Sequence, residues 1–104
     1  MSNNAFRPII DPATNLQTCV NKTAGDTTAK TALNCEEAEI NCHTYAVYFR
    51  FGPPDVTVSS ANGFYLAAGQ KIRWQTSRGA NTIAYINATG GENGVISIAP
   101  GNAE

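Results

Sequence analysis

Charged residues are scarce in this chain of 104 residues. Asp, Glu, Lys and Arg make up 14% of it, against about a quarter in an average soluble protein. The 7 basic side chains nearly balance the 8 acidic ones and are scattered along the chain. Proteins that bind nucleic acid usually gather basic residues on one face or along one helix. We therefore expect no nucleic acid among the partners.

Long apolar runs are also missing. No segment approaches the roughly 18 consecutive apolar residues that a membrane-spanning helix needs, so we expect no membrane partner. The first ten residues lack the charged and then apolar regions of a signal peptide, which predicts a protein that stays inside the cell or a mature form. The length predicts one small domain.

Cysteine is too rare, and odd in number, for a closed disulfide framework. The three residues are Cys19, Cys35 and Cys42. One disulfide, between Cys35 and Cys42 or between Cys19 and either of them, remains an alternative. We favour free and mostly buried thiols, because free cysteine behaves as a small apolar residue.

Residues for catalysis or metal binding are equally sparse. The only histidine, His43, follows Cys42, and adjacent residues on a strand point to opposite faces, so they cannot act as a nucleophile–base pair. The paired cysteine spacing of a zinc site is absent. Three nearby carboxylates, Glu36, Glu37 and Glu39, are more typical of a solvated strand end than of a calcium loop. We predict no catalytic residues, no metal site and no cofactor.

What the chain does contain is a series of short strand patterns from residue 16 onward. The segments are 16–23, 27–33, 36–42, 44–51, 56–60, 64–67, 71–76, 82–89 and 95–99. Turn signals separate them at intervals of about 8–12 residues, which is typical of a sandwich or barrel. We predict an all-β fold, a single small β-sandwich or jelly-roll-like barrel of about eight short antiparallel strands. A helix over 28–40 is the main alternative, because Ala, Leu and Glu favour helices.

Alternation within these segments assigns side chains to faces. The residues predicted to point into the core are Ala38, Ile40, Cys42, Tyr45, Val47, Phe49, Phe51, Ile72 and Trp74. Those predicted to point outward include Glu37, Glu39, Asn41, Tyr48, Arg50 and Arg73. The glycine-rich segment 90–94 precedes a strand and not a helix, so we interpret it as a hairpin turn and not as a phosphate-binding loop.

The N-terminal segment has a different character. Pro8 and Pro12 push the residues before them toward extended conformations. We predict an extended N-terminal arm over residues 1–14 and a β-sandwich domain over residues 15–104. The arm is predicted to bind a partner by extended pairing with a sheet edge. Its candidate contact residues are Phe6, Arg7, Ile9 and Ile10.

Three segments of the second half carry a family resemblance. They are "AVYFRFG" (46–52), "FYLAAGQKIRW" (64–74) and "TIAYINATGGENGVISIAPGN" (82–102). Together they resemble a pattern in small virion proteins of tailed bacteriophages, across residues 45–102. This chain departs from that pattern at Tyr85, where a small residue is common, and at Pro53 and Pro54.

The resemblance implies a β-sandwich protein without enzymatic activity, made in the bacterial host cytoplasm and located in the virion. The implied role is that of a capsid decoration or cement protein, a homo-oligomer that binds the major capsid protein or another virion protein. A tail, neck or fibre component is an alternative. So is a carbohydrate-binding module, with Tyr48, Tyr65 or Trp74 as the contact surface.

Overall fold

The computed structural model describes residues 7–75 and 80–102, and these residues form strands and connections without any helix. The all-β prediction is therefore confirmed, and the helical alternative for 28–40 is wrong. The strands are β1 (Arg7–Pro8), β2 (Ile10–Asp11), β3 (Leu16–Gln17), β4 (Val20–Thr23), β5 (Ala29–Ala32), β6 (Glu37–His43), β7 (Val47–Gly52), β8 (Phe64–Leu66), β9 (Lys71–Gln75), β10 (Thr82–Asn87) and β11 (Val95–Asn102). No helix of the described residues is long and apolar enough to cross a membrane.

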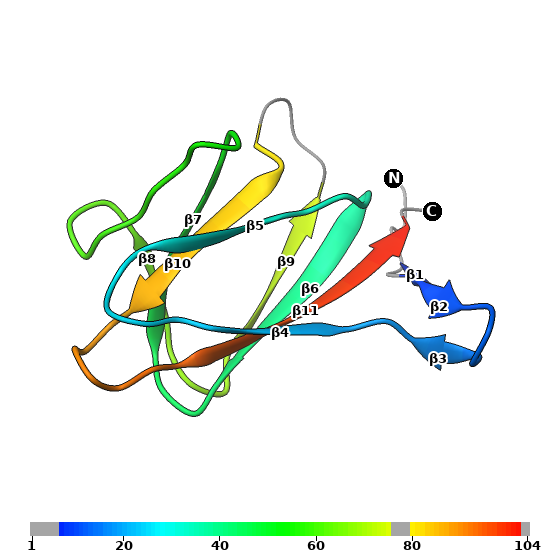
Figure 1. Ribbon diagram of the computed structural model, residues 1–104, viewed down its shortest axis with the longest axis horizontal. Helices are drawn as coiled ribbons and strands as arrows, with labels where there is room; N and C mark the ends of the chain where they lie inside the picture. The colour runs from blue at the N-terminus through cyan, green and yellow to red at the C-terminus, as the bar shows by residue number, and fades with distance from the viewer. Residues whose placement is uncertain (1–6, 76–79, 103–104) are drawn as a thin grey trace, which may run out of the picture.

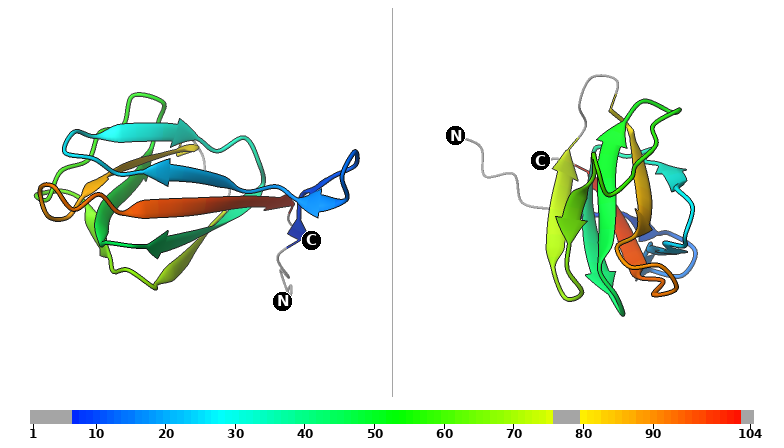
Figure 2. Two further views of the ribbon diagram at one scale, coloured as in Figure 1. Left: turned by 60° about the horizontal axis from the view of Figure 1, so that its bottom comes forward. Right: turned by 90° about the vertical axis from the view of Figure 1, so that its left-hand side faces the viewer.

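Two antiparallel sheets pack face to face into a sandwich that is not a closed barrel (Figures 1 and 2). One sheet has the order β1-β11-β6-β9, with β4 pairing beside β1 on the same side of β11. The other has the order β5-β10-β7-β8. The strands of three or more residues in the described chain, β4 to β11, agree with the predicted number.

The core lies between the sheets and consists mainly of aliphatic side chains. Its buried members are Ala24, Leu33, Ala38, Ile40, Cys42, Val47, Phe49, Leu66, Trp74, Ile83, Tyr85, Ile96 and Ile98. The rings of Phe51 and Trp74 stack with centroids 6.2 Å apart and join β7 of one sheet to β9 of the other. The inward predictions for β6, β7 and β9 are confirmed with one exception. Tyr45 is 45% exposed, because Thr44 has a φ of 77° and the strand starts only at Val47.

Residues 56–60 form no strand, so that prediction is wrong. Pro53 and Pro54 end β7, and the chain then folds over the outer face of the four-stranded sheet. Val56 and Val58 are buried there against Ala84 of β10. The alternating apolar residues are buried, but they pack a loop against a sheet face and form no further strand.

The glycine-rich segment 90–94 is not a hairpin turn, contrary to the prediction. It connects β10 to β11, which belong to different sheets. Gly91 has a φ of 82°, so the positive φ expected in this segment is present. The strand after the segment runs to Asn102, beyond the predicted end at residue 99, and this extension forms the pairing site for β1.

The N-terminal segment forms a β-hairpin of its own. β2 and β3 pair with each other and lie beyond the end of the sandwich (Figure 1). The turn depends on Asp11, whose Oδ1 accepts a hydrogen bond from the Ala13 N–H at 2.9 Å and whose carbonyl accepts one from the Asn15 N–H at 2.7 Å. Asn15 has a φ of 60°, which asparagine tolerates better than most residues. The predicted arm boundary after residue 14 falls inside this turn.

Candidate docking site

The hairpin β2–β3 exposes an aliphatic side chain on each of its faces. Ile10 is 47% exposed and Leu16 is 65% exposed. Ile10 lies opposite Gln17, and Asp11 lies opposite Leu16, so the two aliphatic residues occupy opposite faces. A two-stranded hairpin is marginally stable in water by itself, so contact with another surface would stabilise it.

The base of the hairpin is held firmly on the sandwich. The Ile9 N–H donates to the Pro100 carbonyl of β11 at 3.1 Å. The Ile9 carbonyl in turn accepts hydrogen bonds from the Thr18 N–H at 2.9 Å and from the Thr18 hydroxyl at 3.2 Å. These bonds fix the direction in which the hairpin leaves the body.

The predicted contact residues that the structure describes lie in different elements and differ in exposure. Phe6 lies outside the described residues. Arg7 belongs to β1, where its backbone pairs with Asn102. Ile9 is half-buried at the hairpin base, and Ile10 is exposed on the hairpin. Leu16 was not among the predicted contact residues, because the pattern of residues 16–23 predicted one longer strand of the sandwich there.

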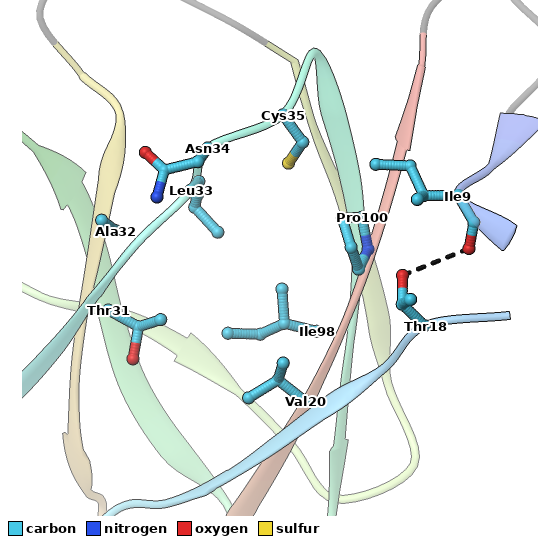
Figure 3. A pocket seen from close by; sticks show the side chains of 10 residues that line it. All are labelled: Ile9, Thr18, Val20, Thr31, Ala32, Leu33, Asn34, Cys35, Ile98 and Pro100. Atoms are coloured by element: carbon cyan, nitrogen blue, oxygen red, sulfur yellow. Dashed lines mark hydrogen bonds between the residues drawn. The ribbon is translucent and has the colours of Figure 1, made fainter. Parts of the chain in front are cut away.

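An apolar pocket of about 260 Å³ opens beside the hairpin base (Figure 3). It lies between the edge strands β4 and β5, with β11 at its floor. The residues that line it are Ile9, Thr18, Val20, Thr31, Ala32, Leu33, Asn34, Cys35, Ile98 and Pro100. Figure 3 shows Val20, Leu33 and Ile98 directed toward its centre. The lining contains no charged side chain, so the pocket suits an aliphatic group.

The cysteines form no disulfide, in agreement with the favoured prediction. Only Cys42 is buried, however, while Cys35 is half-buried and Cys19 is exposed, so the expectation of mostly buried thiols is wrong. Burial raises the pKa of the Cys35 thiol in the pocket wall, and burial also raises the pKa of Cys42. Both thiols are therefore protonated and poorly nucleophilic at neutral pH.

A polar group across three strands was not foreseen. His43 Nε2 lies 2.8 Å from the Ser97 hydroxyl, which donates to Asn21 Oδ1 at 2.6 Å. Because the serine proton is directed to the asparagine, the imidazole donates to the serine oxygen and does not act as its base. The group is exposed on the outer face of the five-stranded sheet. Cys42 points the other way, into the core, as predicted.

Glu37 was predicted to point to solvent, and it is fully buried. It lies on the face that alternation requires, but the Arg73 side chain of β9 lies against it. Arg73 Nε and NH2 donate to Glu37 Oε1 at 3.1 and 3.0 Å, and Oε2 has no hydrogen-bond partner among the described residues. Strand alternation predicts the face of the sheet on which a side chain lies, but not which other side chains cover that face. No sequence pattern therefore indicated that Glu37 is buried.

A second polar contact joins the two connections at one end of the sandwich. Asp26 Oδ1 accepts hydrogen bonds from the Gly91 N–H at 3.0 Å and from the Asn87 side-chain amide. These bonds, the backbone one first, lower the pKa of Asp26 from its ordinary value of 3.8. Asn87 also donates to Asn93 Oδ1 at 3.2 Å. The contact holds the connection between β4 and β5 against the one between β10 and β11.

The fold separates Trp74 from the two tyrosines that were candidates for a sugar-binding surface. Trp74 is buried, and its indole N–H donates to the Ala80 carbonyl at 3.2 Å, so it is not a contact residue. Tyr65 is 59% exposed and packs edge-on against Tyr48, with ring centroids 5.7 Å apart. Phe64, 65% exposed, leans toward Phe49 at the sheet edge. Over residues 7–75 and 80–102, no three His, Cys, Asp or Glu side chains gather as metal ligands would.

Comparisons with known proteins describe the fold and do not name a family. No family model matches the chain, and no curated protein matches it. A solved structure titled "Crystal Structure of FeII HppE" is similar with a TM-score of 0.52 and 10% identity, over 78% of this chain and 43% of that one. The chain thus spans less than half of that protein's length. A subunit from a structure of Bacillus endospore appendages, described as disulfide-linked pili, aligns at 19% identity over 98% of this chain and 95% of that one, with a TM-score of 0.47.

Proposed function

We propose that this protein is a structural component of a bacteriophage virion, a decoration or cement protein that binds the capsid shell and stabilises it. The observation that carries the proposal is the β2–β3 hairpin, which projects from the sandwich and exposes Ile10 and Leu16. The resemblance of residues 45–102 to small virion proteins supports the same role. In this role the sandwich is a scaffold and the hairpin is the contact element.

The energetics suit a subunit that binds in many copies. Fully burying one aliphatic side chain contributes about 1.5–3 kcal/mol, so Ile10 and Leu16 together supply a modest affinity for each copy. A ligand that binds the assembled shell better than its separated subunits stabilises the assembly by mass action. Many weak and equivalent contacts then resist rupture of the particle without any single strong site.

The experiment measures binding to capsids and the resistance of the particles. Leu16→Asp is compared with Thr23→Asp, a matched control at an exposed position on β4, away from both faces of the hairpin. We expect capsids to bind the wild-type and Thr23→Asp proteins and to survive heat and low salt better with them. Leu16→Asp is expected to lose both effects. If decorated and bare capsids rupture under identical conditions, the cement role is refuted.

A tail, neck or fibre position is the variant of this proposal that cross-linking would identify. In purified particles, cross-links from the protein to a tail component instead of the shell would relocate it. The position of the hairpin at one end of the molecule suits either neighbour.

A carbohydrate-binding role is the second candidate, and the exposure of Tyr65 beside Tyr48 favours it. Aromatic rings on a sheet surface can stack on sugar rings. A glycan array with wild-type protein and Tyr65→Ala tests this role. Binding that disappears in Tyr65→Ala would support it, and an array without any binding would remove it.

A further inference from the structure

One chain carries both an exposed apolar protrusion and an open apolar pocket. Leu16 is 65% exposed on the hairpin, so it does not occupy the pocket beside the base of its own hairpin. The pocket of about 260 Å³ is lined mainly by aliphatic groups and has more room than one leucine side chain requires. The protrusion and the pocket are separate features of the same molecule, and the pocket opens beside the base of the hairpin.

The sheet edges are poor alternatives for contact between copies. Lys22 lies on the edge strand β4, Lys30 on β5, and Lys71 on β9, while β8 has only three residues. Charged residues and short length are the usual means by which edge strands avoid pairing with another chain. Contact between copies is therefore more favourable by insertion of an apolar side chain into a pocket than by addition of a strand to a sheet edge.

We infer that the protein self-associates head to tail, with the Leu16 face of the β2–β3 hairpin of one copy inserted into the β4/β5 pocket of the next copy. The occupant is a second copy of this chain. Leu16 would contact the aliphatic groups of Val20, Leu33 and Ile98 that point into the pocket (Figure 3).

Charge complementarity supports this pairing. Asp11 lies opposite Leu16 on the same face of the hairpin, and it is the only charged residue between Pro8 and Gln17. On the pocket side, Lys22 shares a face of β4 with Val20, which lines the pocket. Inserting Leu16 brings Asp11 toward Lys22.

The geometry of the contact decides the form of the assembly. A head-to-tail contact is heterologous, because each copy offers its hairpin to one neighbour and its pocket to another. Such contacts form rings or open chains, whereas two copies that exchanged hairpins reciprocally would form a closed dimer.

The test uses sedimentation velocity on the purified full chain over a wide range of concentrations. Leu16→Asp disables the hairpin, and Val20→Phe fills the pocket from its β4 wall. Their controls are Gln17→Asp on the other face of the hairpin and Thr23→Phe on the outward face of β4. We expect the wild type and both controls to associate with increasing concentration. Each disabling variant should weaken association by about tenfold to a hundredfold, the effect of one buried aliphatic side chain.

Mixing the two disabled variants gives the decisive result. Leu16→Asp still offers a pocket and Val20→Phe still offers a hairpin, so together they should form a heterodimer and nothing larger. A wild type that stays monomeric at every concentration overturns the inference. So does a mixture without a heterodimer. Circular dichroism of each variant confirms that it is folded.

One further variant separates the hairpin from the preceding segment. A chain without residues 1–6 should associate like the wild type if the hairpin is the inserted element. Loss of association in that chain would indicate that residues 1–6, and not the hairpin, occupy the pocket of the next copy. This result would refute the inference. Both proposals use Leu16, so in a head-to-tail assembly only a copy with a vacant hairpin offers this residue to the shell. No capsid is present in these experiments, so their failure would not refute binding to the shell, and failure of shell binding would not refute self-association.

Discussion

The connection between β10 and β11 contains three glycines that should respond differently to the same added methyl group. A Cβ on Gly94 would lie 2.7 Å from Val47 Cγ1 and closer still to the Tyr45 carbonyl oxygen. Gly91 has open space around it but a φ of 82°. Gly90 has open space and no positive φ. Gly94→Ala therefore tests a close backbone approach, and Gly91→Ala tests backbone strain. Gly90→Ala carries neither penalty and is the reference.

The expected magnitudes follow from these differences. Gly94→Ala forces the backbone apart and should lower the free energy of unfolding by about 3 kcal/mol, the upper end of overpacking costs. Gly91→Ala should lower it by about 1 kcal/mol, the penalty of a left-handed conformation. Gly90→Ala should raise it by about 0.5 kcal/mol, because alanine restricts the unfolded chain. A domain of this size has about 5–15 kcal/mol in total, so the first change is severe.

Urea unfolding followed by tryptophan fluorescence measures these values. Trp74 is the only tryptophan and is buried, so its emission reports the sandwich directly. The slope of free energy against urea should stay constant, which would show that the midpoint shift reflects stability. In thermal unfolding, Gly94→Ala should melt roughly 10–20 °C below the wild type. If Gly94→Ala is as stable as Gly90→Ala, the close approach of Gly94 to Tyr45 is wrong.

Three further changes test the polar contacts and the thiols. Arg73→Met should lower the free energy of unfolding in urea by about 2–3 kcal/mol, less than the about 3–5 kcal/mol typical of breaking a fully buried pair, because Arg73 is 38% exposed. Adding Glu37→Gln should restore part of this loss, because it removes the unpaired buried charge. A double variant no more stable than Arg73→Met would argue against the pair. Asp26, with its lowered pKa, contributes stability that is present above pH 3.8 and lost as the pH falls below it. Asp26→Asn should flatten this acid part of the plot of unfolding free energy against pH. An unchanged plot would contradict the contact. Cys19 should react with a thiol reagent in the native protein, whereas Cys42 should react only on unfolding; equal rates would refute the burial of Cys42.

Sequence patterns predicted the sheets better than the connections between them. The alternation in β6 and β9 placed Ile40 and Trp74 in the core correctly, because a strand sends successive side chains to opposite faces wherever it lies. The same local rule failed for residues 56–60, where the apolar residues pack under a loop. It also failed for 90–94, because the sequence does not show that β10 and β11 belong to different sheets.

The candidate docking site was predicted only in part. Prolines and isoleucines indicated an extended, sticky N-terminal segment, and Ile10 is exposed as a contact residue would be. Leu16 was missed because hairpin pairing between residues 10–11 and 16–17 removes it from the sandwich. The pocket had no signal at all, since its wall joins β4, β5 and β11, which are far apart in the chain.

By itself, the sequence determined the all-β class, the inward row of most strands and the low content of charged residues, because each of these follows from composition or from a period of two residues. Only the tertiary structure decided which side chains meet. Ser97 lies between His43 and Asn21 through strand register, and the buried Glu37 pairs with Arg73 of the neighbouring strand β9. These contacts depend on long-range pairing between strands, and local patterns do not encode the partner of a strand.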